Sequence, residues 1–121
     1  MPAKLSTHAL DLTSGRPAAG MKIELWRHDA TATLVKTVTT NADGRTDVPL
    51  LDAATMATGT YELLFFVGDY FAARSQGVAR LEPPERFLDR VPVRFGIADA
   101  SASYHVPLLV TPWAYNTYRG S

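Results

Sequence analysis

Apolar and polar residues alternate with a period of two along most of the chain. Residues 21–28, MKIELWRH, place Met, Ile and Leu on one face and Lys, Glu and Trp on the other, which predicts a strand with one face in a core. Residues 91–97, VPVRFGI, repeat this pattern. Residues 61–67 and 104–110, YELLFFV and YHVPLLV, are apolar on both faces and predict strands buried from both sides. The β-branched, half-polar residues 34–40, LVKTVTT, are typical of a more exposed strand.

Turn-forming residues and one helical stretch separate these segments. Residues 41–45, NADGR, contain the Asp-Gly pair that tight turns favour. Residues 69–77, DYFAARSQG, predict a short helix with Asp69 as its N-cap and Gly77 at its end. About seven to eight strands at near-regular spacing with one short helix predict an all-β fold, an antiparallel β-sandwich.

Two prolines restrict where the strands can lie. Pro92 and Pro107 have no N–H to donate, so each strand is expected to be an edge strand or to bulge at its proline. An apolar edge strand favours aggregation in a monomer unless another strand covers it. We therefore expect a homo-oligomer in which a second copy pairs with such an edge.

Composition excludes several kinds of function. The 121 residues predict a single domain, residues 1–121. Lys plus Arg and Asp plus Glu both number 12, a balance that predicts no basic face for nucleic acid or an anionic membrane. The absence of cysteine excludes disulfides and thiolate chemistry. With no apolar signal stretch and no window long enough for a transmembrane helix, we expect a cytoplasmic protein.

Three histidines are the candidate chemical groups. His8 and His105 each lie beside apolar residues on the outward face of a predicted strand, next to Leu10 and Leu109 respectively. Taken singly, either histidine more often makes only a hydrogen bond at an interface. Together they favour a polar groove between subunits. His28 ends a strand among charged residues and is expected at the solvated surface.

Sequence motifs for other chemistries are missing. The chain has no Gly-x-Ser-x-Gly elbow and no histidine pair with metal-ligand spacing, so neither a serine hydrolase nor a metal site is expected. Arg45 follows the turn at residues 41–45, where an isolated arginine is usually a surface residue. The residues alone thus predict an oligomeric β-sandwich with a polar, histidine-bearing face.

Three stretches together resemble the transthyretin-related family: residues 5–26 (LSTHALDLTSGRPAAGMKIELW), 40–47 (TNADGRTD) and 104–121 (YHVPLLVTPWAYNTYRGS). The terminal Tyr-Arg-Gly-Ser is the most specific part, because it resembles the hydrolases of this family and is lacking in its hormone carriers. The resemblance covers essentially the whole chain. It implies a transthyretin-like (prealbumin-like) sandwich, a homotetramer with a central channel between dimers, and a native end at Ser121.

The resemblance also implies an activity and a site. The activity is hydrolysis of 5-hydroxyisourate, the product of urate oxidation, to 2-oxo-4-hydroxy-4-carboxy-5-ureidoimidazoline, without a metal or other cofactor. The implied catalytic residues are His8, Arg45, His105 and Ser121. The implied substrate-binding residues are His8, Arg45, Thr111, Tyr118, Arg119 and Gly120. Thr111 stands where many members of the family have serine, and it keeps the hydroxyl.

These residue types suit the hydrolysis of a cyclic amide. Histidine moves protons near neutral pH, and a neighbouring arginine disfavours the imidazolium and keeps a neutral base available. We assign water activation to His105, whereas His8 either orients the water or protonates the leaving nitrogen; the sequence leaves the division of acid and base roles open. The planar fork of Arg45 matches adjacent oxygens, and its charge stabilises an oxyanion.

Two other functions fit the same sandwich. The first is a carrier of a small ligand without catalysis, whose channel would be lined mainly by apolar residues. The two histidines and the arginine favour chemistry over carriage. The second is a plain interaction module, which accounts for the strands but gives no reason for the terminal Tyr-Arg-Gly-Ser.

Overall fold

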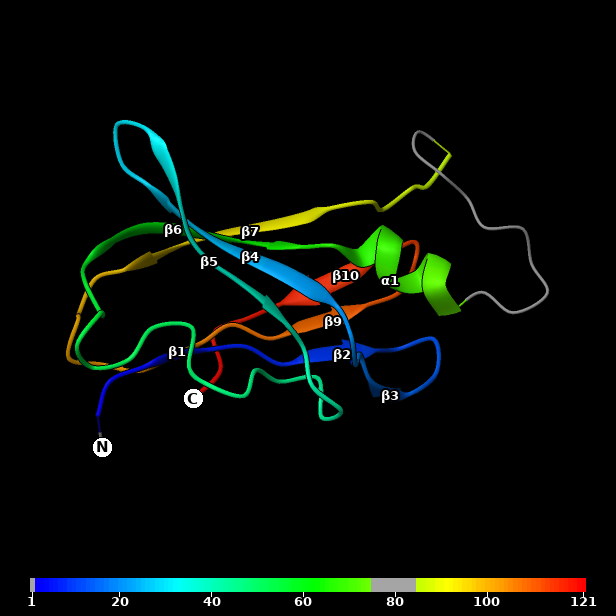
Figure 1. Cartoon of the computed structure of the whole chain (residues 1–121), viewed down its shortest axis with the longest axis horizontal. Helices are drawn as coiled ribbons and strands as arrows, with labels where there is room; N and C mark the ends of the chain where they lie inside the picture. The colour runs from blue at the N-terminus through cyan, green and yellow to red at the C-terminus, as the bar shows by residue number, and fades with distance from the viewer. Residues whose placement is uncertain (1, 75–84) are drawn as a thin grey trace.

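The computed structural model describes residues 2–74 and 85–121. In this part of the chain, two four-stranded sheets face each other as the layers of a sandwich (Figure 1). One sheet has the order β5-β4-β6-β7 and comprises β4 (Lys22–His28), β5 (Ala32–Thr39), β6 (Gly59–Phe65) and β7 (Val91–Ile97). The other has the order β10-β9-β2-β3 and comprises β2 (Ala9–Asp11), β3 (Arg16–Pro17), β9 (Leu108–Val110) and β10 (Tyr115–Thr117). A separate pair joins β1 (Leu5–Ser6) to β8 (Tyr104–His105).

Two segments expected to be single strands are each interrupted. Residues 5–11 form β1 and β2, and residues 104–110 form β8 and β9. Pro107 lies in the second gap, and β9 lies inside its sheet between β10 and β2, so this proline breaks a strand and does not mark an edge. Both pairs between these segments, β1 with β8 and β2 with β9, are parallel, a departure from the purely antiparallel arrangement. The other pairs are antiparallel, and the predicted sandwich is confirmed.

The edge position predicted for Pro92 is confirmed, because it lies exposed in β7 at the end of its sheet. The other edge of this sheet is β5, which is largely exposed as expected. Burial of residues 61–67 from both sides was wrong for β6. Its residues alternate, with Leu63 and Phe65 buried and Leu64 half-buried, because only one face of this sheet packs against the second layer.

Alternating side chains of the two sheets fill the space between the layers. Ile23 and Leu25 of β4 lie opposite Phe65 and Leu63 of β6 in the antiparallel register, and all four are fully buried. Leu108 of β9 is buried from the opposite layer. Burying one such side chain stabilises the fold by about 1.5–3 kcal/mol, so this core fixes the register of the strands.

Helix α1 (Val67–Arg74) follows β6. It begins two residues before Asp69, so Asp69 lies in the first turn and is not the predicted N-cap. In this position its negative charge interacts favourably with the helix dipole. The predicted end at Gly77 lies outside the described residues. The hydroxyl of Tyr70 donates to Oδ2 of Asp11 at 2.9 Å and ties α1 to β2. Burial and this bond raise the pKa of Tyr70 to about 12.

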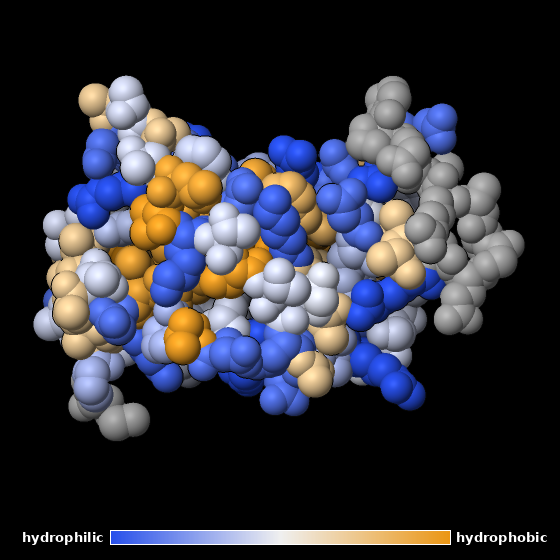
Figure 2. Space-filling view, viewed as in Figure 1, coloured by the Kyte–Doolittle hydropathy of each residue, from blue (hydrophilic) through white to orange (hydrophobic). Residues whose placement is uncertain are grey.

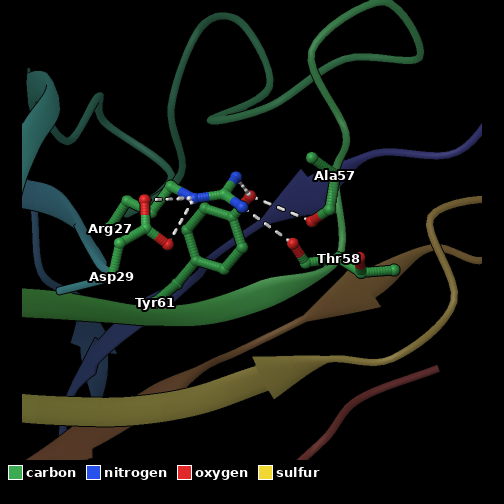
Figure 3. A network of polar contacts seen from close by, with 5 residues as sticks. All are labelled: Arg27, Asp29, Ala57, Thr58 and Tyr61. Carbon is green, nitrogen blue, oxygen red and sulfur yellow. Dashed lines mark hydrogen bonds and ion pairs between the residues drawn. The ribbon is translucent and has the colours of Figure 1, made fainter.

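A polar network at the C-terminal end of β4 fixes the loop that precedes β6 (Figure 3). The guanidinium of Arg27 donates to the hydroxyl of Tyr61 at 2.8 Å and to the carbonyl of Thr58 at 2.9 Å. Its Nε lies 3.1 Å from both carboxylate oxygens of Asp29, and Tyr61 donates onward to the carbonyl of Ala57 at 2.9 Å. This network joins two strands and a loop and has a structural role.

Different elements lie at the two ends of the sandwich. Figure 1 shows α1 at one end, and β1 with both ends of the chain toward the other. In the space-filling view most of the visible face is hydrophilic, with apolar side chains grouped in its left half and centre (Figure 2). Among the described residues, no helix is both long enough and apolar enough to cross a membrane.

Candidate active site

His8 is held by the turn at residues 41–45. The amide of Ala9 donates to the carbonyl of Gly44 at 2.8 Å, and Nε2 of His8 lies 2.8 Å from the carbonyl of Asp43. Since a carbonyl only accepts, Nε2 of His8 carries the hydrogen. Gly44 has φ +74° and lies so close to Ala9 that a Cβ would overlap the carbonyl oxygen of Ala9. The predicted Asp-Gly turn therefore brings its backbone directly to this histidine.

His105 lies on β8 beside Ser6 of β1. The two residues are partners in the parallel register, and Oγ of Ser6 lies 2.9 Å from Nδ1 of His105. The same ladder continues past the gap, where the amide of Leu108 donates to the carbonyl of His8 at 2.9 Å. Since Ser6 and His8 are two residues apart on one extended segment, this register places both histidines on the same outward face.

The electrostatic surroundings of His105 are positive. Burial is the largest cause that lowers its pKa below the usual value, and the charges of Arg45, His8 and Lys4 lower the pKa further. The sequence predicted the effect of Arg45 on this histidine. An unprotonated imidazole is thereby favoured at neutral pH.

Arg45 is exposed, and its backbone is fixed by Asn41. The amide of Arg45 lies 3.1 Å from Oδ1 of Asn41, and the amide of Asn41 donates to the carbonyl of Arg45 at 2.8 Å. Among the described residues no carboxylate forms an ion pair with its guanidinium. Its donors are thus left for an anionic or oxygen-rich group.

Replacing Arg45 with glutamine is expected to raise the pKa of His105, because the change removes a nearby positive charge. An NMR titration of the imidazole would measure this shift directly. The direction of the shift follows from the charge of Arg45. In the wild type the lowered pKa keeps the imidazole neutral at pH values somewhat below the ordinary histidine pKa of about 6.5. In the variant the imidazole would already become protonated at a higher pH than in the wild type. Lys36→Gln is the control, since Lys36 is not among the groups that act on His105. An unchanged pKa in Arg45→Gln would place the guanidinium away from the imidazole.

The end of the chain folds against His105. Strand β10 pairs with β9 through Thr117 and Leu108 and directs the following residues toward β8. The amide of Gly120 donates to the carbonyl of His105 at 2.7 Å, and the two residues form an isolated antiparallel bridge. A Cβ on Gly120 would lie 2.6 Å from Cδ2 of the imidazole. The backbone of the tail, residues 118–121, is therefore packed on the ring, and only glycine permits this approach.

Arg119 points elsewhere within one chain. Its guanidinium carbon lies 4.2 Å from the centre of the Tyr104 ring, and Nη2 donates to the carbonyl of Ser103 at 3.3 Å. Its charge also contributes to the lowered pKa of Asp99, which is caused first by hydrogen bonds from Ser101. These contacts anchor the tail, and none of them joins Arg119 to the histidines.

Three other predicted residues form no hydrogen bond, ion pair or ring contact with the histidines among the described residues. Thr111 lies in the turn between β9 and β10, and its hydroxyl accepts from the amides of Trp113 and Ala114 at 3.1 and 3.0 Å. Tyr118 is 56 % exposed and lines a groove beside β7. Ser121 is exposed at the end of the chain. One chain thus brings together His8, Arg45, His105 and Gly120.

Two residues near His105 were missed from the sequence. Ser6 and Lys4 precede His8 on the same segment, and Ser6 shares the outward face with His8. This shared face was a usable signal, but the pairing of Ser6 with His105 depends on the parallel register across about a hundred residues.

Among the described residues, His28 and the acidic side chains form no second centre. Nε2 of His28 lies 3.5 Å from Oε1 of Glu62, and both belong to the other sheet. Across the described ranges, no cluster of three or more histidine or acidic side chains could hold a metal ion.

Comparison with known proteins places the chain in a family. The model of the HIUase/Transthyretin family matches residues 5–120. The chain belongs to this family. A "5-hydroxyisourate hydrolase 2" of Rhizobium meliloti (strain 1021) is 57 % identical over 119 residues, which cover 98 % of this chain and 96 % of that protein. The resemblance read from the three sequence stretches is therefore confirmed.

Two solved structures share the fold. An (S)-allantoin synthase matches with a TM-score of 0.88 and 42 % identity over 99 % of this chain and 44 % of the synthase, so the chain spans less than half the length of that protein. The 5-hydroxyisourate hydrolase of Klebsiella pneumoniae matches with a TM-score of 0.78 and 33 % identity over 98 % and 100 % of the two chains. Both matches support the transthyretin-like sandwich.

Proposed function

We propose that this chain hydrolyses 5-hydroxyisourate to 2-oxo-4-hydroxy-4-carboxy-5-ureidoimidazoline in urate degradation. The observation that carries the proposal is the setting of His105, whose imidazole is bonded to Ser6 through Nδ1 and packed against Gly120. Burial and then the charges of Arg45 and His8 lower its pKa. Family membership supports the choice of substrate, because similar members bear the name 5-hydroxyisourate hydrolase. Neither a metal nor another cofactor takes part in the proposed reaction.

His105 is the proposed general base. Its Nδ1 is occupied by Ser6, so Nε2 takes the proton as water adds to a carbonyl carbon of the six-membered ring. The tetrahedral oxyanion then collapses and the ring C–N bond breaks. The leaving nitrogen takes the proton from Nε2 of His105, directly or relayed through Nδ1 of His8, while the former carbonyl becomes a carboxyl group. Base catalysis of this kind supplies about 10² to 10⁴ in rate.

Arg45 and His8 complete the proposed chemistry. The guanidinium of Arg45 binds adjacent oxygens of the substrate and stabilises the oxyanion. Nε2 of His8 donates to the carbonyl of Asp43, so Nδ1 of the neutral ring carries a lone pair; through it His8 either orients the water or, once it has taken up a proton there, protonates the leaving nitrogen. Arg45→Lys keeps the charge but loses the planar fork and is expected to bind substrate more weakly.

The tail closes the proposed site. Gly120 lies against the imidazole, and we assign Tyr118, Arg119, Gly120 and Thr111 to substrate binding and Ser121 to catalysis in the assembled protein. The contacts of Arg119 with Tyr104 and Ser103 give it, in addition, a role in holding the tail.

A homotetramer of single-domain chains would supply the remaining walls of the site. The edge strand β7 and the tail flank one groove whose lining includes Val93, Phe95 and Tyr118, an apolar edge that a second copy would cover. Phe87 and Trp113 are 70 % and 66 % exposed with ring centres 6.2 Å apart, which also favours burial in an assembly. Light scattering would report the mass of the assembly.

Residence in the cytoplasm stays a prediction.

One assay tests the proposed function. Freshly generated 5-hydroxyisourate is followed with and without the protein, and the uncatalysed decay of the substrate is subtracted. The proposal expects decay to accelerate in proportion to protein concentration. A carrier would bind the compound without changing this rate, and an interaction module would do neither, so an unchanged decay rate would overturn the proposal.

Gly120→Ala is expected to lower turnover roughly 10- to 100-fold, because a displacement of about 1 Å at a catalytic group has effects of that size. The added methyl would lie 2.6 Å from Cδ2 of His105, so either the ring or the tail must move. Ala32→Val, which adds methyl groups at an exposed position of the edge strand β5 away from the tail, serves as the control. Equal activity of the two variants would remove the close packing of tail and ring from the mechanism.

A further inference from the structure

Ser6 is the one described side chain that hydrogen-bonds the imidazole of His105. Its Oγ lies 2.9 Å from Nδ1 in a partly buried position. The contact is built into the fold, because Ser6 and His105 are register partners in the β1–β8 pair. Neighbouring backbone bonds hold this register on both sides: the amide of Tyr104 donates to the carbonyl of Lys4, and the amide of Val106 donates to the carbonyl of Ser6, both at 2.9 Å.

The other ring nitrogen is left for chemistry. Across residues 2–74 and 85–121, no protein group bonds to Nε2 of His105. Nor is Nε2 a buried atom without a partner, since the described residues contain none, so this nitrogen reaches solvent. The imidazole is therefore held at Nδ1 and open at Nε2.

We propose that Ser6 is a positioning residue whose hydroxyl accepts a hydrogen bond from Nδ1–H of His105 and so keeps the lone pair on the open Nε2. The inference rests on the proposed function, in which Nε2 takes a proton from water. Neutral imidazole has one N–H and one lone pair, so fixing the hydrogen on Nδ1 fixes the base at Nε2. The unconstrained side chain favours the opposite tautomer, in which Nε2 carries the hydrogen and cannot act as a base.

A hydroxyl suits this position better than a carboxylate would. A carboxylate beside Nδ1 would stabilise the imidazolium, as in triads of serine hydrolases, and would counteract the nearby positive charges. Burial and then those charges lower the pKa of His105, and the neutral hydroxyl of Ser6 does not reverse their effect. The packing of Gly120 on the same ring limits the rotation that would release Nδ1 from Ser6. Ser6 and Gly120 thus orient the imidazole of His105, whereas burial and the positive charges keep it neutral.

The test compares Ser6→Ala with Ser6→Thr and with the control Ser103→Ala. Ser103 is an exposed hydroxyl residue near β8, and its Oγ accepts from the amide of Lys4 at 3.2 Å without touching the imidazole. The ring nitrogens of ¹⁵N-labelled protein are recorded by NMR at pH about 8, above the usual histidine pKa of about 6.5. The chemical shifts of Nδ1 and Nε2 report which nitrogen carries the hydrogen. The second readout is kcat and KM for 5-hydroxyisourate.

In the wild type and in Ser103→Ala, Nδ1 of His105 is expected to carry the hydrogen. In Ser6→Ala the hydrogen should move toward Nε2, and kcat should fall about fivefold with KM unchanged, the size expected from one neutral hydrogen bond. Ser6→Thr keeps the hydroxyl and should restore both the tautomer and most of the turnover. A general loss of folding would change the spectra of all three histidines and not only that of His105, and Ser6→Thr would not reverse it.

Two results would overturn the inference. One is an unchanged His105 spectrum in Ser6→Ala; the other is a changed tautomer with full turnover. The spectra need no substrate, so they stand apart from the proposed function. Failure of the wild-type protein to accelerate 5-hydroxyisourate decay would contradict the function, whereas failure of the spectrum to change would contradict the role of Ser6.

Discussion

Replacing His105 with alanine is expected to lower kcat for 5-hydroxyisourate by about 10² to 10⁴, the usual contribution of a general base, with little change in KM. The imidazole is half-buried and bonded through Nδ1 to Ser6, and its lowered pKa keeps it ready to accept a proton. Binding depends mainly on Arg45 and the tail in this account, so the loss should fall on turnover. Steady-state kinetics with correction for uncatalysed decay would measure both constants.

His28→Ala is the matched control for this variant. Its imidazole contacts Glu62 at 3.5 Å in the other sheet, so its removal should leave kcat within about twofold, as for surface changes away from a site. If His105→Ala lost affinity and turnover equally, the histidine would be a binding group. If it kept full turnover, the base would be a different residue.

Deletion of residues 118–121 is expected to abolish measurable hydrolysis while the sandwich stays folded. Strand β10 ends at Thr117, so its pairing with β9 is retained. The deletion removes the bond from Gly120 to the carbonyl of His105 and the contact of Arg119 with the Tyr104 ring. It thereby opens His105 to water and takes away a wall of the proposed pocket.

Circular dichroism and light scattering are the controls for this deletion, because a loss of fold or assembly would lower activity indirectly. The expected protein has the spectrum, the mass and the cooperative unfolding of the wild type. A shortened protein with unchanged activity would exclude residues 118–121 from the mechanism. A shortened protein that cannot fold would show instead that the tail is needed for the sandwich itself.

Much of the fold could be predicted because β4, β6 and β7 each bury one face. The alternation in residues 21–28 and 91–97 matches β4 and β7, since a strand at the surface of a two-layer sandwich must sort its side chains by face. The edge position of Pro92 also followed from chemistry, because a missing N–H is tolerated there. These features depend on neighbouring residues and are visible in a short window of sequence.

Features that depend on distant residues were harder to predict. The extended segments at 5–11 and 104–110 pair in parallel, and no local pattern states this direction. Pro107 was expected at an edge or bulge, but it lies where its segment divides into β8 and β9. The helix begins two residues before Asp69, because backbone contacts such as Gly68 with Asp89 outweigh the capping preference of one side chain.

The candidate site was predicted in part for the same reasons. His8 and His105 could be placed on outward faces from alternation alone, whereas Arg45 beside its turn indicated only a surface residue and entered the site through the resemblance. Arg119 and Thr111 were assigned from the resemblance, yet within one chain Arg119 stacks on Tyr104 and the hydroxyl of Thr111 bonds amides of its own turn. Short polar side chains often satisfy nearby backbone groups in this way.

A crystal structure with bound urate would show whether His8, Arg45, His105 and the tail form one pocket, since urate is a stable relative of the substrate with similar ring oxygens. We expect the purine to lie against the tail, with a ring atom near Nε2 of His105 and its oxygens bound by Arg45. Urate bound away from both side chains, or His8 and His105 facing separate surfaces in the assembled protein, would contradict it.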